Sequence, residues 1–349
     1  MAGQQTDHTD PGAALRSRPR PLLGRPLFGG RALLGRTLLV WTLVAPWGLW
    51  AAVRLCAVDR LPGVGVPAVP LLSFTPYAAA TAPIPFLCAA VLRRWRAAAV
   101  AGIVTAGLLA AVAPRALESG QPPAAGPELR VLSANLQFGG ADPDALVDLV
   151  RRTGTEVLST QELTPAAVTA LERAGLTRLL PYKVLEARPG PTGIGIYSRH
   201  PLRALSPVAG TTTPMPRAEL SLPGDVRVEI VAVHPLPPLS ATASENWRRD
   251  IAAIPGATED GPVRVVAGDF NATMDHARFR AAIARGYADV ADRAGKGLTP
   301  TWGVRTGGPS LVIDHILVSR RLAVRRVETH ALPGSDHRAL SSLVRLPTA

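Results

Sequence analysis

The sequence predicts an α/β or α+β sandwich that follows three transmembrane helices. Three apolar stretches in the first third of the chain each run for at least 17 residues without a charge, about the lower limit for a membrane helix. Beyond residue 129, short apolar runs alternate with helical patterns. This alternation is typical of domains in which helices pack on sheets.

A basic lead of 36 residues, rich in Arg, Pro and Gly, begins the chain. It repeats no apolar face, so we expect it to be disordered. Residues 1–130 carry 13 Lys+Arg against 5 Asp+Glu, whereas residues 131–349 carry 25 against 21. Most of the net charge of +12 therefore lies outside the second part of the chain, and it is weak evidence for binding nucleic acid.

The apolar stretches cover residues 37–53, 61–92 and 97–114. Six prolines interrupt the second, so we expect its helix to begin near Ser73. A buried soluble bundle is the alternative, but soluble helices normally show a polar face. A cleaved signal peptide fits poorly, because the lead is long and two further apolar stretches follow the first. The stretches contain no Asp, Glu, Lys or His, which favours an anchor at 37–114 over a transport path.

The arginines that flank these stretches predict the orientation of the anchor. Six lie in the lead, and Arg93, Arg94 and Arg96 lie between the second and third stretches. Because Lys and Arg collect on the cytoplasmic side, the N-terminus is expected to be cytoplasmic. The protein is then a multi-pass cell-membrane protein with residues 129–349 outside the cytoplasm. Residues 115–128 have the composition of a linker stiffened by proline.

Turn and cap signals divide residues 129–349 into strands and helices. Asp142 followed by Pro143 begins a helix that Gly154 ends, Thr164 begins another, and Asp275 caps a third. Cys56 and Cys88 both lie earlier in the chain, so this part folds without disulfides and has no zinc-type cysteine spacing. The expected strands are 129–134, 157–160, 194–198, 226–233, 263–267, 313–318 and 339–346.

Polar residues follow or precede many of these strands, where ligands gather in layered α/β folds. Taken singly, each has a structural explanation, such as a turn at Asp269 and Asn271 or a helix cap at Glu162. Their recurrence at six strand ends favours a functional site. The positions are Asn135, Gln161, Glu162, His234, Asp269, Asn271, Asp314, His315, Ser335, Asp336 and His337.

The order of the motifs resembles the endonuclease/exonuclease/phosphatase superfamily over residues 129–346. That resemblance implies a four-layer sandwich of two mixed β-sheets flanked by helices, and a metal-dependent phosphoester hydrolase: a phosphodiesterase, nuclease or phosphatase. The motifs are SerAlaAsnLeuGln (133–137), ThrGlnGlu (160–162), GlyIleGlyIleTyrSerArg (193–199), ValHisPro (233–235), GlyAspPheAsnAla (268–272), ThrTrp (301–302), IleAspHisIleLeu (313–317) and GlySerAspHisArg (334–338).

The resemblance implies a metal site at Asn135, Glu162 and Asp336. Mg²⁺ is the expected ion, with Mn²⁺ as the alternative, because a hard cation prefers carboxylate and amide oxygens. The ion would offset charge on the phosphoryl oxygens as the transition state develops.

The resemblance also implies catalytic roles. Asp269 would orient or deprotonate the attacking water, and Asn271 would donate a hydrogen bond to a phosphoryl oxygen. His337 would act as a base or a charged clamp with Asp314 as its partner, and His234 as the general acid. Arg217 resembles an arginine that contacts the substrate phosphate.

The substrate stays open among nucleic acid, a phospholipid head group and a small phosphodiester. Val312 stands where the family often has Arg, and the sequence contains no recognisable inserted element that would clamp DNA. The lipid bilayer is the expected partner, and no protein partner is predicted. The alternative is a membrane-tethered binding protein on a catalytically inactive hydrolase fold.

The motifs of serine hydrolases, zinc proteases and P-loop proteins do not occur.

Overall fold

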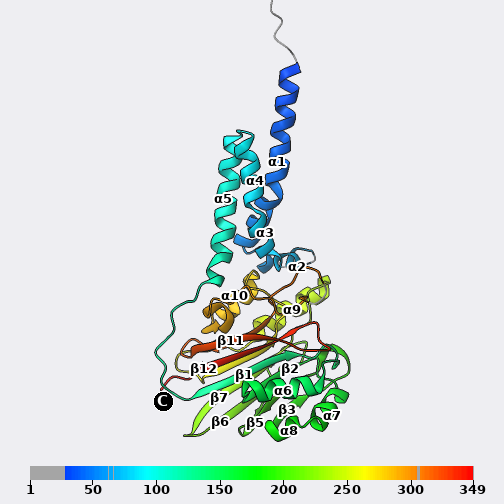
Figure 1. Cartoon of the computed structure of the whole chain (residues 1–349), viewed down its shortest axis with the longest axis vertical. Helices are drawn as coiled ribbons and strands as arrows, with labels where there is room; N and C mark the ends of the chain where they lie inside the picture. Colours follow the sequence, from blue (N-terminus) through cyan, green and yellow to red (C-terminus); the bar gives the residue numbers. More distant parts are fainter. Residues whose placement is uncertain (1–27, 62, 66, 305–306, 349) are drawn as a thin grey trace, which may run out of the picture.

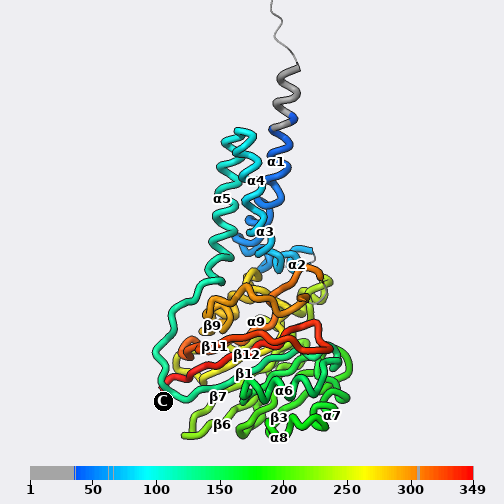
Figure 2. Tube along the Cα trace, in the orientation of Figure 1, coloured from blue at the N-terminus to red at the C-terminus, as the bar shows by residue number. Residues whose placement is uncertain are grey.

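The computed structural model describes residues 28–61, 63–65, 67–304 and 307–348. A group of helices extends from one end of a β-sandwich (Figures 1 and 2). Most of the lead expected at residues 1–36 lies outside the described residues. Its last part is helical, however, because α1 (Phe28–Leu55) begins at Phe28. The expectation of disorder is therefore wrong for residues 28–36, which include a run of good helix formers at ArgAlaLeuLeu (31–34).

The sandwich consists of two six-stranded sheets. Each contains one parallel pair, β1 with β2 and β7 with β8, among antiparallel neighbours. Both are therefore mixed sheets, as expected. In spatial order the first sheet holds β11 (Ala323–Ala331), β12 (Arg338–Arg345), β1 (Glu128–Asn135), β2 (Val157–Gln161), β4 (Ile194–Ser198) and β3 (Tyr182–Glu186). The second holds β5 (Leu202–Leu205), β6 (Arg217–Leu222), β7 (Val226–Val233), β8 (Arg264–Asp269), β10 (Asp314–Ser319) and β9 (Tyr287–Asp289).

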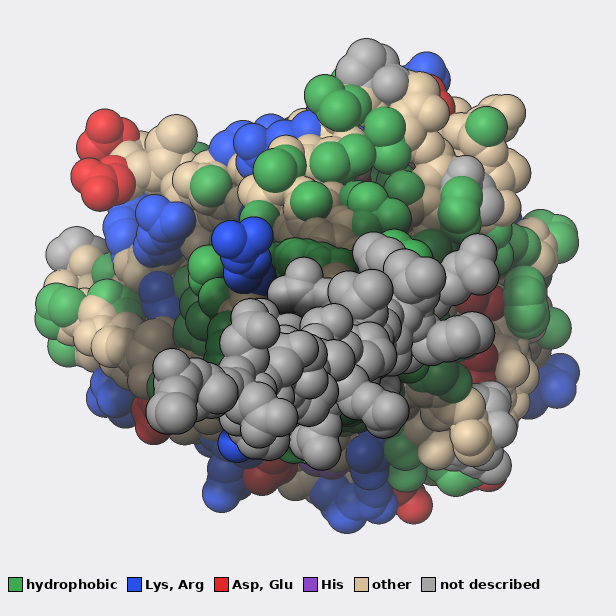
Figure 3. Space-filling view, turned by 90° about the horizontal axis from the view of Figure 1, so that it is seen from above, with side chains coloured by type: hydrophobic (Ala, Val, Ile, Leu, Met, Phe, Trp, Pro, Cys, Tyr) green, Lys and Arg blue, Asp and Glu red, His purple; other side chains and the backbone are tan. Residues whose placement is uncertain are grey.

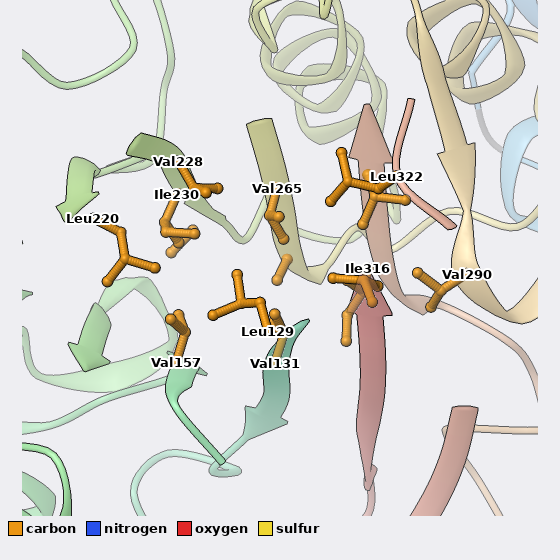
Figure 4. Packing of buried hydrophobic residues seen from close by; sticks show 14 of the residues in the cluster. Leu129, Val131, Val157, Leu220, Val228, Ile230, Val265, Val290, Ile316 and Leu322 are labelled. Carbon is orange, nitrogen blue, oxygen red and sulfur yellow. The ribbon is translucent and has the colours of Figure 1, made fainter. Parts of the chain in front are cut away.

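The inner faces of the two sheets pack on each other and form the main core. Val131 and Val157 from the first sheet lie opposite Ile230, Val265 and Ile316 from the second (Figure 4). All five are buried. Aliphatic side chains of this kind each contribute roughly 1.5–3 kcal/mol when they are fully buried, so this layer is the main source of stability.

Helices cover the two outer faces. On the first sheet lie α6 (Pro143–Thr153), α7 (Pro165–Arg173) and α8 (Leu176–Leu179). On the second lie α9 (Ala241–Ala253) and α10 (Ala277–Ile283), and α11 (Val290–Arg293) follows β9. The caps of α6 and α7 are those predicted, since Asp142 accepts from the backbone N–H groups of Asp144 and Ala145 and Thr164 accepts from that of Ala167.

Several strands were not predicted because they carry weak patterns. β3 and β5 are exposed edge strands, and β9 has only three residues. β6 and β11 were missed as well, and β11 is partly exposed. The prediction that Asp275 caps a helix is wrong, because the N-cap of α10 is His276 and the Asp275 carboxylate makes other contacts.

Within the described residues, two helices are long and apolar enough to cross a membrane, Thr37–Leu55 and Trp95–Ala116, rather than the three expected. The segment between them is broken into α2 (Ala68–Leu72), α3 (Thr75–Thr81) and α4 (Pro83–Val91). Proline explains the breaks, because its ring lacks an N–H and clashes with the preceding turn. The apolar stretch Thr75–Val91 is consequently shorter than the other two. The later helix comprises α5 (Trp95–Val112) and η2 (Ala113–Ala116).

A buried cluster of charges joins these helices to the sandwich. Asp275 accepts from Arg54 Nε at 2.7 Å and from Arg115 at 2.6 and 2.8 Å, and all three side chains are buried. Nearby, His276 Nε2 donates to the Val69 carbonyl at 2.9 Å, and the Tyr77 hydroxyl donates to the Ser310 carbonyl at 2.8 Å. One carboxylate therefore binds the ends of both long helices.

We predict that Asp275→Ala loosens this joint and lowers the free energy of unfolding by about 3–5 kcal/mol, because it leaves two buried guanidinium groups unpaired. Asp148→Ala is the control, since its ion pair with Arg151 is exposed and is expected to change stability by less than about 1 kcal/mol. Thermal unfolding of the detergent-solubilised chain measures both. Equal melting temperatures for the two variants would contradict the assignment.

The same joint predicts a pH dependence. Burial alone would raise the pKa of Asp275, but Arg115 and Arg54 outweigh it and lower that pKa below its usual range. The stabilisation is therefore fully present when the pH is above about 3.9, the pKa of Asp275 in the unfolded chain. It is lost as the pH falls through the lower pKa that Asp275 has in the folded chain. Thermal unfolding between pH 6 and pH 2 is expected to show a larger loss of stability in the wild type than in Asp275→Ala, because Glu229 and Asp269 also have lowered pKa values and contribute a loss to both.

Candidate active site

Six strand ends meet at one edge of the sandwich. β1, β2, β7 and β8 bring their carboxyl ends there, because β1 runs parallel to β2 and β7 parallel to β8. β10 and β12 begin at the same edge, since each runs antiparallel to one of these strands. The polar residues that follow or precede these strands are thereby brought together from positions 135 to 337.

Asn135 holds two carboxylates side by side. Its Nδ2 donates to Glu162 Oε1 and to Asp269 Oδ2, each at 3.1 Å. Its Oδ1 accepts from the backbone N–H of Gln137 at 2.9 Å. Asn135 and Asp269 are buried, and Glu162 is largely so. The amide therefore fixes the orientation of two acidic groups that would otherwise repel each other.

His337 lies against the same carboxylates from the other side. Its Nδ1 donates to Asp314 Oδ2 at 2.9 Å, and its Nε2 lies 3.8 Å from Asp269 Oδ2 and 3.9 Å from Asp336 Oδ1. Burial would lower the pKa of His337, but the charges of Asp314, Asp269 and Asp336 outweigh it and raise that pKa to about 10. His337 is therefore an imidazolium cation at neutral pH.

His234 completes the cluster. Its Nδ1 donates to the Pro191 carbonyl at 2.9 Å, which directs Nε2 towards Asp269 Oδ2, 3.5 Å away, and Glu162 Oε1, 3.9 Å away. Burial opposes the charged ring, but the two carboxylates outweigh it and raise the pKa of His234 above its usual value. A histidine with a raised pKa suits the donation of a proton near neutral pH.

The backbone at this edge is strained in a consistent way. Seven described residues other than glycine have positive φ, and four of them border this site: Gln137, Phe138, Glu162 and Asn271. The strained turns aim N–H groups at the acidic cluster, since Phe138 N donates to Glu162 Oε2 at 2.7 Å and Asn271 N to Asp269 Oδ1 at 2.8 Å. Such strain costs roughly 1–3 kcal/mol per residue and is typical of functional sites.

A cavity of about 600 Å³ opens over the cluster. Glu162, His234, Asp269, Asn271, Asp336 and His337 contribute to its wall. Trp302, whose role the sequence analysis left open, donates its Nε1 to Asp336 Oδ2 at 2.9 Å and lines the cavity too. Pro70, Ser73 and Phe74 also line it, although they belong to the helical segment between the two long helices. No sequence signal marks these three residues.

Comparison with known proteins agrees with this geometry. The sequence profile described as Endonuclease/Exonuclease/phosphatase family matches residues 132–337, which is more than half of the chain and spans every residue of the cluster. The chain belongs to the endonuclease/exonuclease/phosphatase family. No curated protein matches it in sequence.

Solved structures are similar to part of this chain. The 3′ phosphatase NExo from Neisseria, bound to a product DNA hairpin, has 16% identity and a TM-score of 0.50, over 61% of this chain and 98% of its own. A humanized TDP2 from D. rerio has 19% identity and a TM-score of 0.49, over 62% and 99%. A family protein from Beutenbergia cavernae has 18% identity and a TM-score of 0.49, over 64% and 72%.

Family enzymes typically depend on a divalent metal, and the oxygen atoms of this site fit such an ion. Glu162 and Asp336 offer carboxylate oxygens at the cavity wall, the type of ligand that Mg²⁺ prefers. Asp269, Asp314 and His337 also bring possible ligand atoms within 4.8 Å of one another, but His337 Nδ1 and Asp314 Oδ2 already bond each other.

The structure does not bring Arg217 into this family site. Arg217 pairs with Val231 in the β6–β7 ladder, on the outer face of the sheet, and its Nε donates to Glu229 Oε1 at 2.7 Å. Side chains alternate along a strand, and Ala218 and Leu220 of β6 face the core between the sheets. Arg217 therefore faces the opposite side, and the suggested phosphate contact is unsupported. His315 is likewise buried away from the cavity, where its Nδ1 donates to Asp289 Oδ2 at 2.8 Å.

We predict that Asp314→Asn lowers the pKa of His337 from about 10 towards its ordinary value of about 6.5. The substitution removes the negative charge that favours the protonated ring, whereas burial, which lowers the pKa, remains. NMR titration of ¹³C-labelled histidine in chelator measures it. Asp289→Asn, which faces His315, is the matched control and is expected to move a different histidine signal. A His337 titration that stays near pH 10 in Asp314→Asn would contradict the pairing.

Proposed function

We propose that this chain is a membrane-anchored, Mg²⁺-dependent phosphoester hydrolase that acts outside the cytoplasm. The observation that carries the proposal is the convergence on one cavity of a His337–Asp314 pair and two carboxylates held by Asn135. A cationic imidazole, a carboxylate that can orient and deprotonate water, and a second histidine that can donate a proton together support hydrolysis of a phosphoester.

In this proposal His337 binds a non-bridging oxygen of the phosphoester, since it is a buried cation at the cavity wall. Asp269 orients the attacking water and accepts its proton. His234 donates a proton to the leaving oxygen, so one P–O bond forms as another breaks. Asn271, whose Nδ2 now donates to the Pro235 carbonyl at 3.0 Å, lies at the cavity wall within reach of the phosphoryl group.

Glu162 and Asp336 would hold the Mg²⁺ ion, with Asn135 orienting Glu162 rather than binding the ion directly. When bound, the ion would supply positive charge that stabilises the phosphoryl oxygens. Mn²⁺ offers similar oxygen preferences and is the alternative ion.

Two features support membrane anchoring in the proposed orientation. The helix Trp95–Ala116 has 22 residues and so spans about 33 Å, close to the roughly 30 Å of a bilayer core. Arg54 and Arg115 at the sandwich end are bound to Asp275, whereas Arg93 and Arg96 at the far end are exposed. Free positive charge at the far end favours a cytoplasmic location for that end. Residues 37–114 would then be the anchor, 115–128 the connection and 129–349 the catalytic domain.

The test is hydrolysis of bis(4-nitrophenyl) phosphate by the full chain in detergent, with Mg²⁺ and with chelator. We predict metal-dependent release of nitrophenol that His337→Ala lowers by a factor of about 10²–10⁴, because the charged clamp is removed. His200→Ala is the matched control, since His200 pairs with Glu156 outside the site. Full activity in chelator, or in His337→Ala, would overturn the proposed roles.

The same experiment separates the proposal from a binding protein on an inactive fold. Mg²⁺ binding by calorimetry without cleavage of bis(4-nitrophenyl) phosphate would favour the binding protein. Cleavage that chelator abolishes would exclude it.

A further inference from the structure

The anchor segment forms part of the active-site cavity. Pro70, Ser73 and Phe74, from α2 and the turn before α3, face the same space as Glu162 and His337. The β7–α9 loop adds Leu236, Pro237, Pro238 and Leu239 to the wall, and most of the exposed lining is apolar. A hydrolase of water-soluble phosphoesters has no need of a wall of this kind beside its catalytic cluster.

A second, apolar groove of about 320 Å³ lies between α1 and α3. Phe74 lines both the cavity and this groove, so its side chain separates the two spaces. The indole N–H groups have partners within the helices, since Trp47 Nε1 donates to the Ala78 carbonyl and Trp50 Nε1 to Thr75 Oγ1, each at 3.1 Å. The groove is lined by Pro46, Trp47, Trp50, Phe74, Tyr77, Ala78 and Thr81.

The groove lies at a depth that suits a lipid chain. Trp47 and Trp50 precede Arg54 by seven and four residues, which is about 6–11 Å along the helix. Arg54 is fixed to the sandwich by Asp275, so the groove opens just beyond the catalytic domain. Trp and Tyr collect at this level of membrane proteins, between the head groups and the hydrocarbon.

The rim of the cavity is also apolar. Phe138 is 61% exposed and Leu239 is 68% exposed, and both line the cavity. Figure 3 shows many hydrophobic side chains exposed on the face of the molecule that is seen from the end that carries the helices. None of the described residues that line the cavity is Lys or Arg, whereas nucleic acid binding depends on many contacts between such residues and phosphates. An exposed apolar surface of this kind favours contact with lipid.

We propose that the substrate is a membrane lipid, with its phosphoester head group in the catalytic cavity and its hydrocarbon chain in the groove between α1 and α3. The inference rests on the proposed function and adds the substrate class. In this proposal the hydrocarbon chain passes Phe74, which borders both spaces, and the buried ion pairs at Asp275 keep the groove beside the cavity. The anchor is thus part of the substrate site as well as a tether.

The experiment uses two synthetic phosphodiesters with one reactive group, ethyl 4-nitrophenyl phosphate and hexadecyl 4-nitrophenyl phosphate. The full chain in detergent micelles with Mg²⁺ is expected to cleave the hexadecyl ester with a kcat/KM greater by on the order of 10-fold or more, since each buried methylene adds to binding. Ala78→Phe fills the groove and is expected to abolish most of this ratio. Ala80→Phe, on the exposed side of the same helix, is the matched control and is expected to keep it.

Both variants are measured in the same detergent, so partition of the hexadecyl ester into micelles affects both ratios equally. It therefore cancels when the two variants are compared. An equal ratio in Ala78→Phe and Ala80→Phe would overturn the inference while leaving the proposed function intact. Failure of the wild type to cleave either ester in Mg²⁺ would instead count against the proposed function.

A binding measurement tests the groove without turnover and does not depend on the folding of any variant. A hexadecyl phosphate with a diazirine in its chain is irradiated with the wild-type chain in chelator, and the labelled peptides are identified by mass spectrometry. Label on Trp47, Trp50 or Tyr77 that unlabelled hexadecyl phosphate displaces is the expected result. Label confined to the outward side of α1 and α5 would show lipid contact alone and would overturn the proposed groove.

Discussion

The face-to-face packing of two mixed sheets is the constraint on which the site depends. Each sheet contributes one parallel pair, so β1, β2, β7 and β8 end at the same edge. Close approach of the strands is part of this arrangement, since a Cβ at Gly268 would lie 1.9 Å from the Val233 carbonyl oxygen. The aliphatic core between the sheets then fixes how far Asp269 lies from Asn135, because a close-packed interior deforms little.

Electrostatic balance explains why so many charges can be buried at that edge. Two histidines face the acidic cluster, and Asn135 donates to two of its carboxylates. The backbone of Phe138 and Asn271 donates to the same groups from strained turns. A buried carboxylate without such partners would lose its charge, so the partners preserve the ionised state that binding of a metal and a phosphoester requires.

The long helices and the sandwich form a connected unit through Asp275. This carboxylate binds arginines at the ends of both long helices, although they lie 61 positions apart in sequence. The segment after the second long helix follows the sandwich surface, where Ser119 N donates to the Arg293 carbonyl and Gln121 accepts from Val324 N. The proposed lipid path depends on this joint, because it places the groove beside the cavity.

The sequence by itself determined most strands of the interior, because buried strands and helix caps leave strong local patterns. The order of its motifs carried the resemblance to the family, and that resemblance implied the mixed sheets. It also identified the polar residues of the edge, since the motifs around Asp269 and His337 are contiguous in the chain. Only the tertiary structure decided that Arg217 faces outward and that Asp275 binds Arg54 and Arg115. The same holds for Phe74 in the cavity wall. These features rest on contacts between residues distant in sequence, and local patterns carry no record of them.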